Sequence, residues 1–352
     1  MLKFFKILLL LALIGCSEEP AIYESTDEPP SRYRFKTGSY IEATRNETFA
    51  LCPPDKKTEG TWISEHSVAL SAENCVSIQT PSLAGTIDIQ FLENSGRTDT
   101  IQVLVDQSYI QMGDYSHKIF VADKKQMDMN DKAVYIVAPG SYESRAYNQN
   151  LIVDKTMFTA AEAWYYSKID SNISVPFPYY QLEAEYKDVK LEESRLPYVN
   201  NNNYAAWRFA NVRSKMEGLD TAYCINSSGL VLDTSASGYR VPLEDEWYFL
   251  MRAGASTRYY WGDEDMILAK KDSLVISSYE WIRPAGLKPV AQLLPNAFGL
   301  YDMAGIAAEA CDNSPEGFFM CGKGIAQMIG PVNYKGFRLL RKTPKLHKLD
   351  KF

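Results

Sequence analysis

Hydrophobic and polar residues alternate in short runs between residues 35 and 105, which is the pattern of β-strands that bury one face. The runs read SVALSA, CVSIQT, GTIDIQFLE and TDTIQVLV. Gly, Asn and Ser separate them at spacings of about ten residues, as in small all-β domains. The pattern therefore predicts a compact β-domain in the N-terminal third of the chain.

After this stretch the hydrophobic period changes from that of strands to that of helices. Residues 151–170 run from a strand into a helix, with Thr159 in the N-cap position and Glu162 three residues later, a capping-box arrangement. Residues 203–218 and 238–254 predict two further helices. Long loops rich in Gly, Pro, Asn and Tyr connect these elements, and such loops need buried aromatics, ions or disulfides to hold them.

The first residues have the pattern of a secretory signal peptide. Lys3 and Lys6 precede an apolar run that is too short to remain as a membrane span, and Gly15 comes directly before Cys16. The ending resembles the bacterial lipoprotein box, which would make Cys16 the lipidated first residue of the mature protein. A plain signal peptide is the alternative. Ser17 after the cysteine implies the outer membrane, with the protein facing the periplasm or the cell surface.

The order Cys52, Trp62, Cys75 within the β-domain resembles an immunoglobulin-like β-sandwich, although any small β-module would fit. We expect it to act as a spacer. The predicted organisation is a signal peptide (1–15), a lipid-anchored acidic tether (16–34), the immunoglobulin-like sandwich (35–105), a second domain (106–342) and a basic, frayed tail (343–352).

Charge and cysteine content narrow the function. The formal net charge is −7 and no long Lys/Arg run is present, so a nucleic-acid partner is not expected. Of the six cysteines, Cys16 is assigned to lipidation. In an oxidising compartment we predict the disulfides Cys52–Cys75 and Cys311–Cys321, which leaves one odd thiol.

Five segments of the second domain follow one another in a distinctive order: LPYVNNNNYAAWRFANVRSKMEGL (196–219), GYRVPLEDEWYFLMRAG (238–254), YWGDE (260–264), PVAQLLPNAFGLYDMAG (289–305) and GFRLLR (336–341). Together they resemble the formylglycine-generating enzyme family, also called the sulfatase-modifying-factor domain. The resemblance covers roughly residues 108–342 and implies an α+β fold with little regular secondary structure, related to C-type lectins. Fold alone does not transfer activity, so each functional position must be compared.

The oxygen-dependent enzymes of that family bind copper through two cysteines near the C-terminus and oxidise a substrate cysteine to formylglycine. The corresponding interval, FFMCGKGIAQMIGPVNYKGFR, contains only Cys321, and the Arg-Gly-Gly-Ser-Trp motif is missing. Because Cu(I) prefers two thiolates, copper is not expected, and Cys321 is a weak catalytic candidate beside a disulfide or buried-thiol role. The three histidines, His66, His117 and His347, are too scattered for the three-histidine iron site of a sister branch.

A structural Ca²⁺ is held by family enzymes in the loop that here reads NAFGLYDMAGIAAEACDN (296–313). The resemblance implies Asp302 and Glu309 as side-chain ligands and the carbonyls of Gly305 and Ala307 between them. The competing interpretation is two solvated acids on an ordinary loop. The family's Asn-Val-Trp-Glu-Trp reads Ile-Ala-Ala-Glu-Ala here, so the acid is kept and both indoles are lost.

Positions that form the scaffold are kept and positions that form the site are lost, which is typical of a pseudoenzyme. We therefore expect a lipid-anchored envelope protein whose sulfatase-modifying-factor domain binds a protein or glycan partner without catalysis. Two alternatives stay open. The first is an active sulfatase-maturing oxidase of the formylglycine-generating type, and the second is a calcium-dependent glycan-binding protein.

Overall fold

The computed structural model describes residues 30–70, 74–112, 117–129, 132–145, 149–173, 194–199, 206–227, 229–255, 257, 259–262, 273–281, 287–312, 318–321 and 335–351. The predicted signal peptide, Cys16 and most of the tether lie outside this part of the chain. Within it, no helix combines the length and the apolar character needed to span a membrane.

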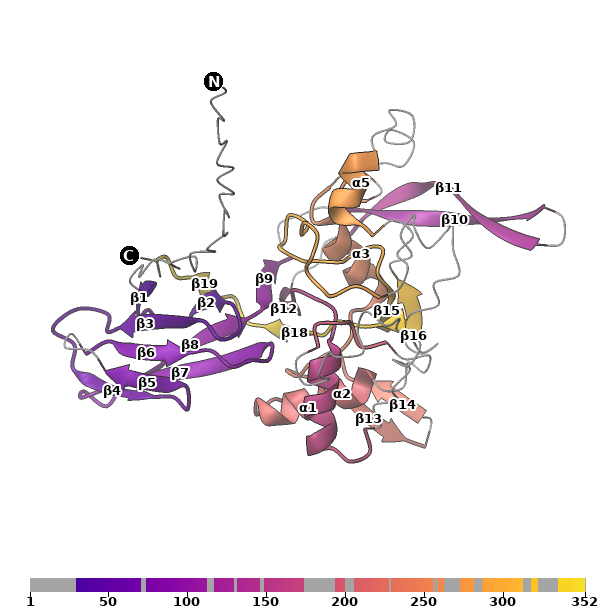
Figure 1. Ribbon diagram of the computed structural model, residues 1–352. Helices are drawn as coiled ribbons and strands as arrows, with labels where there is room; N and C mark the ends of the chain where they lie inside the picture. Colours follow the sequence, from indigo (N-terminus) through magenta and orange to yellow (C-terminus); the bar gives the residue numbers. More distant parts are fainter. Residues whose placement is uncertain are drawn as a thin grey trace, which may run out of the picture.

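The N-terminal region consists of two β-sheets (Figure 1). One has the strand order β1-β3-β6-β5 and the other β19-β2-β8-β7-β4. The strands are β1 (Arg32–Arg34), β2 (Ser39–Ala43), β3 (Thr48–Cys52), β4 (Gly60–Ile63), β5 (Ser67–Leu70), β6 (Val76–Gln79), β7 (Gly85–Glu93), β8 (Thr98–Val105) and β19 (His347–Lys348). Inward-facing residues of both sheets, among them Phe49, Ile78, Phe91 and Ile101, form one apolar core. The immunoglobulin-like topology stays a prediction.

The C-terminal tail is part of this N-terminal region. β19 pairs in parallel with β2, where His347 and Leu349 donate backbone hydrogen bonds to the carbonyls of Gly38 and Tyr40 at 3.2 and 2.9 Å. The Leu349 side chain packs against the apolar core. The prediction of a frayed tail is therefore wrong, because its leucines bury apolar surface and its backbone completes a sheet.

The larger C-terminal domain has several small sheets and few described helices, which fits the α+β prediction. Its sheets are β18-β12-β9, β10-β11, β13-β14 and β16-β15-β17. Its strands are β9 (Gln107–Gln111), β10 (His117–Met129), β11 (Lys132–Arg145), β12 (Asn150–Asp154), β13 (Tyr223–Asn226), β14 (Gly229–Leu232), β15 (Ala308–Asp312), β16 (Phe318–Cys321), β17 (Lys335–Gly336) and β18 (Leu340–Thr343). Its helices are α1 (Ala160–Ile169), α2 (Ala206–Met216), α3 (Glu244–Arg252) and α5 (Ser273–Tyr279).

The predicted capping box of α1 is confirmed. The backbone N–H of Thr159 and its hydroxyl both donate to the Glu162 carboxylate at 2.7 Å, and the Glu162 backbone N–H donates to the Thr159 hydroxyl at 3.3 Å. Helix α3 begins later than the sequence pattern predicted. Arg240 instead exchanges backbone hydrogen bonds with Leu340 at 2.8 and 2.9 Å, so this part of the segment is extended.

A buried polar network joins the two regions. The Thr86 hydroxyl on β7 lies 2.9 Å from Gln107 Oε1 and 3.3 Å from the Tyr239 hydroxyl, and it accepts a hydrogen bond from Arg341 at 3.1 Å. Gln107 in turn donates to Asp154 at 3.0 Å. Because Gln107, Tyr239 and Asp154 are buried and their hydrogen bonds are costly to break, this network holds the N-terminal region against the larger domain through the half-buried Thr86.

Candidate functional site

The loop over residues 296–312, where the sequence predicted calcium ligands, begins with a side chain that shapes it. Asn296 is buried, and its amide nitrogen donates to the Leu250 carbonyl at the end of α3 at 2.7 Å. Its side-chain oxygen accepts from the backbone N–H groups of Phe298 and Leu300 at 3.0 and 3.1 Å. One asparagine therefore both closes the turn and attaches it to the helix.

Asp302 lies deep inside this loop. It is 2% exposed and adopts a left-handed backbone conformation with φ of 56°. One carboxylate oxygen accepts from the Ala291 N–H at 2.7 Å, whereas Oδ1 is buried without a hydrogen bond among the described residues. Burial raises the pKa of Asp302 to about 6. Gly305 follows with φ of 106°, in a space where a Cβ would lie 2.6 Å from the Glu280 Cγ.

Glu309 on β15 is held by two buried partners. Arg338 donates from Nε to Oε2 at 2.7 Å and from its terminal nitrogen to Oε1 at 2.6 Å, and the Trp247 indole donates to Oε2 at 2.9 Å. Arg338 also donates to the carbonyls of Lys155 and Tyr301. This fork-to-fork geometry makes Glu309 the counter-ion of a structural arginine. This ion pair was not predicted from the sequence, although Arg338 stands in the GFRLLR motif.

The two acids of the predicted calcium site differ in the oxygens that they offer. Asp302 offers a buried, unbonded oxygen that suits a hard cation. Glu309 does not, because both of its oxygens already accept N–H donors from Arg338 and Trp247. No cluster of three His, Cys, Asp or Glu side chains able to hold a metal occurs in the described ranges. The calcium site at Asp302, Gly305, Ala307 and Glu309 stays a prediction.

The cysteines are mostly bonded to one another. A disulfide joins Cys311 on β15 to Cys321 on β16, and both residues are buried. A second disulfide joins Cys52 on β3 to Cys75 beside β6. Among the described residues only Cys224, exposed on β13, is free. The sulfur of Cys321 is therefore not available as a thiolate in this state.

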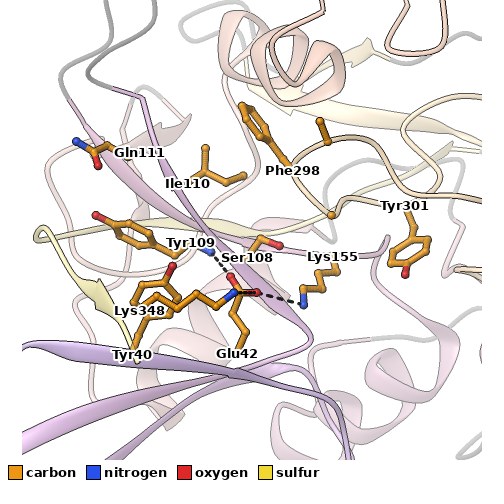
Figure 2. A pocket seen from close by; sticks show the side chains of 12 residues that line it. Tyr40, Glu42, Ser108, Tyr109, Ile110, Gln111, Lys155, Phe298, Tyr301 and Lys348 are labelled. Atoms are coloured by element: carbon orange, nitrogen blue, oxygen red, sulfur yellow. Dashed lines mark hydrogen bonds and ion pairs between the residues drawn. The ribbon is translucent and has the colours of Figure 1, made fainter. Parts of the chain in front are cut away.

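A cavity of about 530 Å³ lies at the seam between the two regions (Figure 2). We call it the seam cavity. Its walls come from β2, β9, the turn at residues 297–299 and the tail strand β19. Glu42 stands in it, 3.1 Å from the Lys348 amine, 3.8 Å from the Lys155 amine and 3.5 Å from the Tyr109 backbone N–H. A smaller hollow of about 330 Å³ shares the same three charged side chains.

Aromatic rings line the rest of the seam cavity. The ring centroids of Tyr40 and Tyr109 lie 4.9 Å apart, and Phe298 and Tyr301 also line the cavity. Burial, reinforced by the charge of Glu42, raises the pKa of Tyr40 to about 12, so its hydroxyl stays protonated. The combination of rings, charges and hydroxyls is typical of a polar ligand site. No sequence pattern indicated the seam cavity, because its residues come from distant segments.

Comparison with known proteins gives the following. A sequence model described as a sulfatase-modifying factor enzyme 1-like domain matches residues 130–327. No curated protein matches the chain in sequence. CarF is 19% identical, with a TM-score of 0.44 over 68% of this chain and 98% of CarF. Treponema denticola variable protein 1 is 18% identical, with a TM-score of 0.45 over 67% of this chain and 99% of that protein. PvdO from Pseudomonas aeruginosa is 16% identical, with a TM-score of 0.43 over 67% and 94% of the two chains.

Proposed function

Because the chain belongs to the family of proteins with a sulfatase-modifying factor enzyme 1-like domain, we propose that it uses this domain to bind a partner in the cell envelope and not to oxidise cysteine. One observation carries the proposal. Cys321, which is the single cysteine of the C-terminal interval, is bonded to Cys311 and 1% exposed. Copper-dependent oxidation in this family needs two thiolates, whereas the sulfurs of Cys311 and Cys321 are bonded to each other in a disulfide.

The ion pair that Glu309 forms supports the same proposal. Family resemblance assigned this acid to a metal, but here it neutralises Arg338 inside the fold. Arg338 in turn donates to the carbonyls of Asp154 at the end of β12 and of the loop residues Lys155 and Tyr301. The loop thus keeps its shape through an ion pair, which suits a domain retained as a binding scaffold.

The direct test is oxygen consumption. The purified protein, loaded with Cu(I) and given a cysteine-containing peptide, should consume no oxygen above a metal-free blank, while an active formylglycine-generating enzyme serves as the positive control. Copper-dependent oxidation of the peptide that disappears in Cys321→Ser would overturn the binding proposal and establish the oxidase. A Cys224→Ser variant separates adventitious copper binding at the exposed thiol from chemistry at Cys321.

Lipid anchoring at Cys16 is the second part of the proposal, and it rests on the lipobox-like sequence. The natural protein should fractionate with the outer membrane and gain the mass of its acyl chains at Cys16. Cys16→Ser should release it into the soluble fraction or leave its signal peptide uncleaved, whereas Cys224→Ser should change neither. Membrane attachment that persists in Cys16→Ser, with the signal peptide removed, would contradict the anchor.

A calcium-dependent role is favoured by the unbonded Oδ1 of Asp302 alone. If Ca²⁺ binds there, millimolar CaCl₂ should raise the Tm of the natural protein and leave Asp302→Asn unchanged, and a calcium-dependent signal on a glycan array would support the lectin alternative. An equal Tm shift in both proteins would remove Asp302 from the site. Mg²⁺ at the same concentration is the matched control, because it prefers a tighter octahedral site.

A further inference from the structure

The charges in the seam cavity are unbalanced. Lys155 and Lys348 face a single carboxylate, Glu42, so the lining carries one net positive charge. The Lys155 amine is 3.8 Å from Glu42, which is longer than a hydrogen bond, and Lys348 is 58% exposed. Both amines therefore retain donors that a ligand can use. An anionic group entering the cavity would meet two ammonium groups at once.

The rings beside these charges are suited to a flat, partly apolar ligand. Tyr40 and Tyr109 form a pair with their centroids 4.9 Å apart and their planes tilted by 39°. Phe298 lines the same cavity from the turn opposite β9 (Figure 2). Tyrosine combines an apolar ring face with a polar hydroxyl group. Its ring can therefore pack on the C–H face of a sugar while the sugar hydroxyls bond to neighbouring polar side chains.

The position of Glu42 argues against an extended peptide. β9 is the outer strand of the sheet β18-β12-β9, and a peptide would normally add along such an edge through its backbone. Here the Tyr109 N–H already points at Glu42, 3.5 Å away, and Glu42 holds Lys348 of the tail. An added strand would have to displace this carboxylate and its lysine. A ligand that lies in the cavity would use them, because Glu42 can accept from sugar hydroxyls.

We propose that the seam cavity binds an acidic saccharide, with a carboxylate of the sugar on Lys155 and Lys348, a ring face on the half-buried Tyr109 and Phe298, and hydroxyls on Glu42. This rests on the proposed binding role and names its ligand class. The site combines the family domain with the N-terminal region, which contributes Tyr40, Glu42 and Lys348 and is then more than a spacer.

The test uses oligogalacturonate as the acidic probe and the same oligomer with methyl-esterified carboxylates as the neutral control, measured by titration calorimetry on the whole protein. We expect the acidic oligomer to bind and the neutral one to bind at least about tenfold more weakly, because each charge-assisted hydrogen bond is worth roughly a factor of ten. Lys155→Ala and Lys348→Ala should each weaken binding about tenfold. Lys57→Ala, which removes an exposed charge outside the cavity, should leave binding unchanged.

Each other outcome is informative. No binding of the acidic oligomer at millimolar concentration, or equal binding of the neutral one, overturns the saccharide assignment. Binding of the acidic oligomer that is unaffected by both lysine substitutions places the site elsewhere, which refutes the seam cavity but keeps the binding role. Failure of the binding role itself would appear separately, as copper-dependent oxygen consumption. Folding of each variant is checked by circular dichroism before titration.

Discussion

The N-terminal β-region and the larger domain bury different kinds of side chains. The core of the β-region is apolar, and its ion pairs keep their arginines in contact with solvent: Arg97, paired with Asp99, is 61% exposed and Arg45, paired with Asp106, is 18% exposed. The larger domain buries three arginine–carboxylate pairs among its described residues: Arg213–Asp154, Arg240–Glu246 and Arg338–Glu309. Each of these side chains is nearly inaccessible to solvent.

Backbone geometry explains the difference. Regular strands pair their own N–H and C=O groups in ladders, so an apolar core is sufficient to hold them. Irregular loops leave carbonyls without a partner, and a buried guanidinium can satisfy several of them. Arg338 donates to the carbonyls of Asp154 at the end of β12 and of Lys155 and Tyr301 in the adjoining loops, while Glu309 neutralises its charge. In this domain the buried ion pairs attach regular elements to the segments beside them, since Asp154 lies on β12, Glu246 on α3 and Glu309 on β15.

Arg338→Met is the change with the largest expected effect. It leaves Glu309 buried without a counter-ion and removes donors from three carbonyls, so we expect a loss of about 3–5 kcal/mol in the free energy of unfolding, measured in urea. Arg97→Met in the β-region is the matched control and should cost less than about 1 kcal/mol. Equal effects of the two substitutions would contradict the comparison, and the double variant Arg338→Met/Glu309→Leu should recover part of the loss.

Asp302→Asn tests a buried carboxylate that lacks such a partner. The folded-state pKa of about 6 lies above the ordinary pKa of 3.8 for an aspartate, so protonated Asp302 favours folding below about pH 4, and this contribution disappears as the pH rises through 6. The difference corresponds to about 3 kcal/mol at most. Without calcium, the variant should match the natural protein near pH 4 and exceed its stability by up to that amount at pH 7. Asparagine tolerates the left-handed backbone, and a difference independent of pH would refute the assignment.

Thr86→Val acts on the joint between the two regions. The valine keeps the shape but removes the hydroxyl that contacts Gln107, Tyr239 and Arg341. We expect a loss of about 2 kcal/mol, because these buried groups lose a partner. Differential scanning calorimetry should then show the β-region and the larger domain unfolding in separate steps. Thr98→Val, at an exposed strand start, is the control and should leave a single transition.

Ile101→Val gives the smallest expected effect. Ile101 is fully buried in the apolar core of the β-region, and removing one methylene group should cost about 1 kcal/mol. Urea unfolding measures it directly. A loss as large as that of Arg338→Met would show that the β-region depends on a few exact contacts, and the contrast with the larger domain would then disappear.

Features that depend on residues close together in the sequence could be predicted, and features that depend on distant residues could not. The capping box of Thr159 and Glu162 depends on residues three apart, so it was readable from the chain. The family motifs fixed the α+β domain in the same way. The seam cavity could not be predicted, because Glu42, Tyr109, Phe298 and Lys348 are spread over the whole length of the chain. No local pattern encodes the closeness of such residues.

The sequence by itself determined the strands β5 to β8 of the β-region, the start of α1 and membership of the sulfatase-modifying-factor family, because each is encoded in local periodicity or in short motifs. Only the tertiary structure decided that Glu309 serves Arg338, that the tail completes the N-terminal sheet, and that two lysines meet one glutamate beside a pair of tyrosines. The physical reason is common to all three. Charged side chains and the edges of strands pair with groups that are distant in the sequence, and these groups come together only when the whole chain has packed.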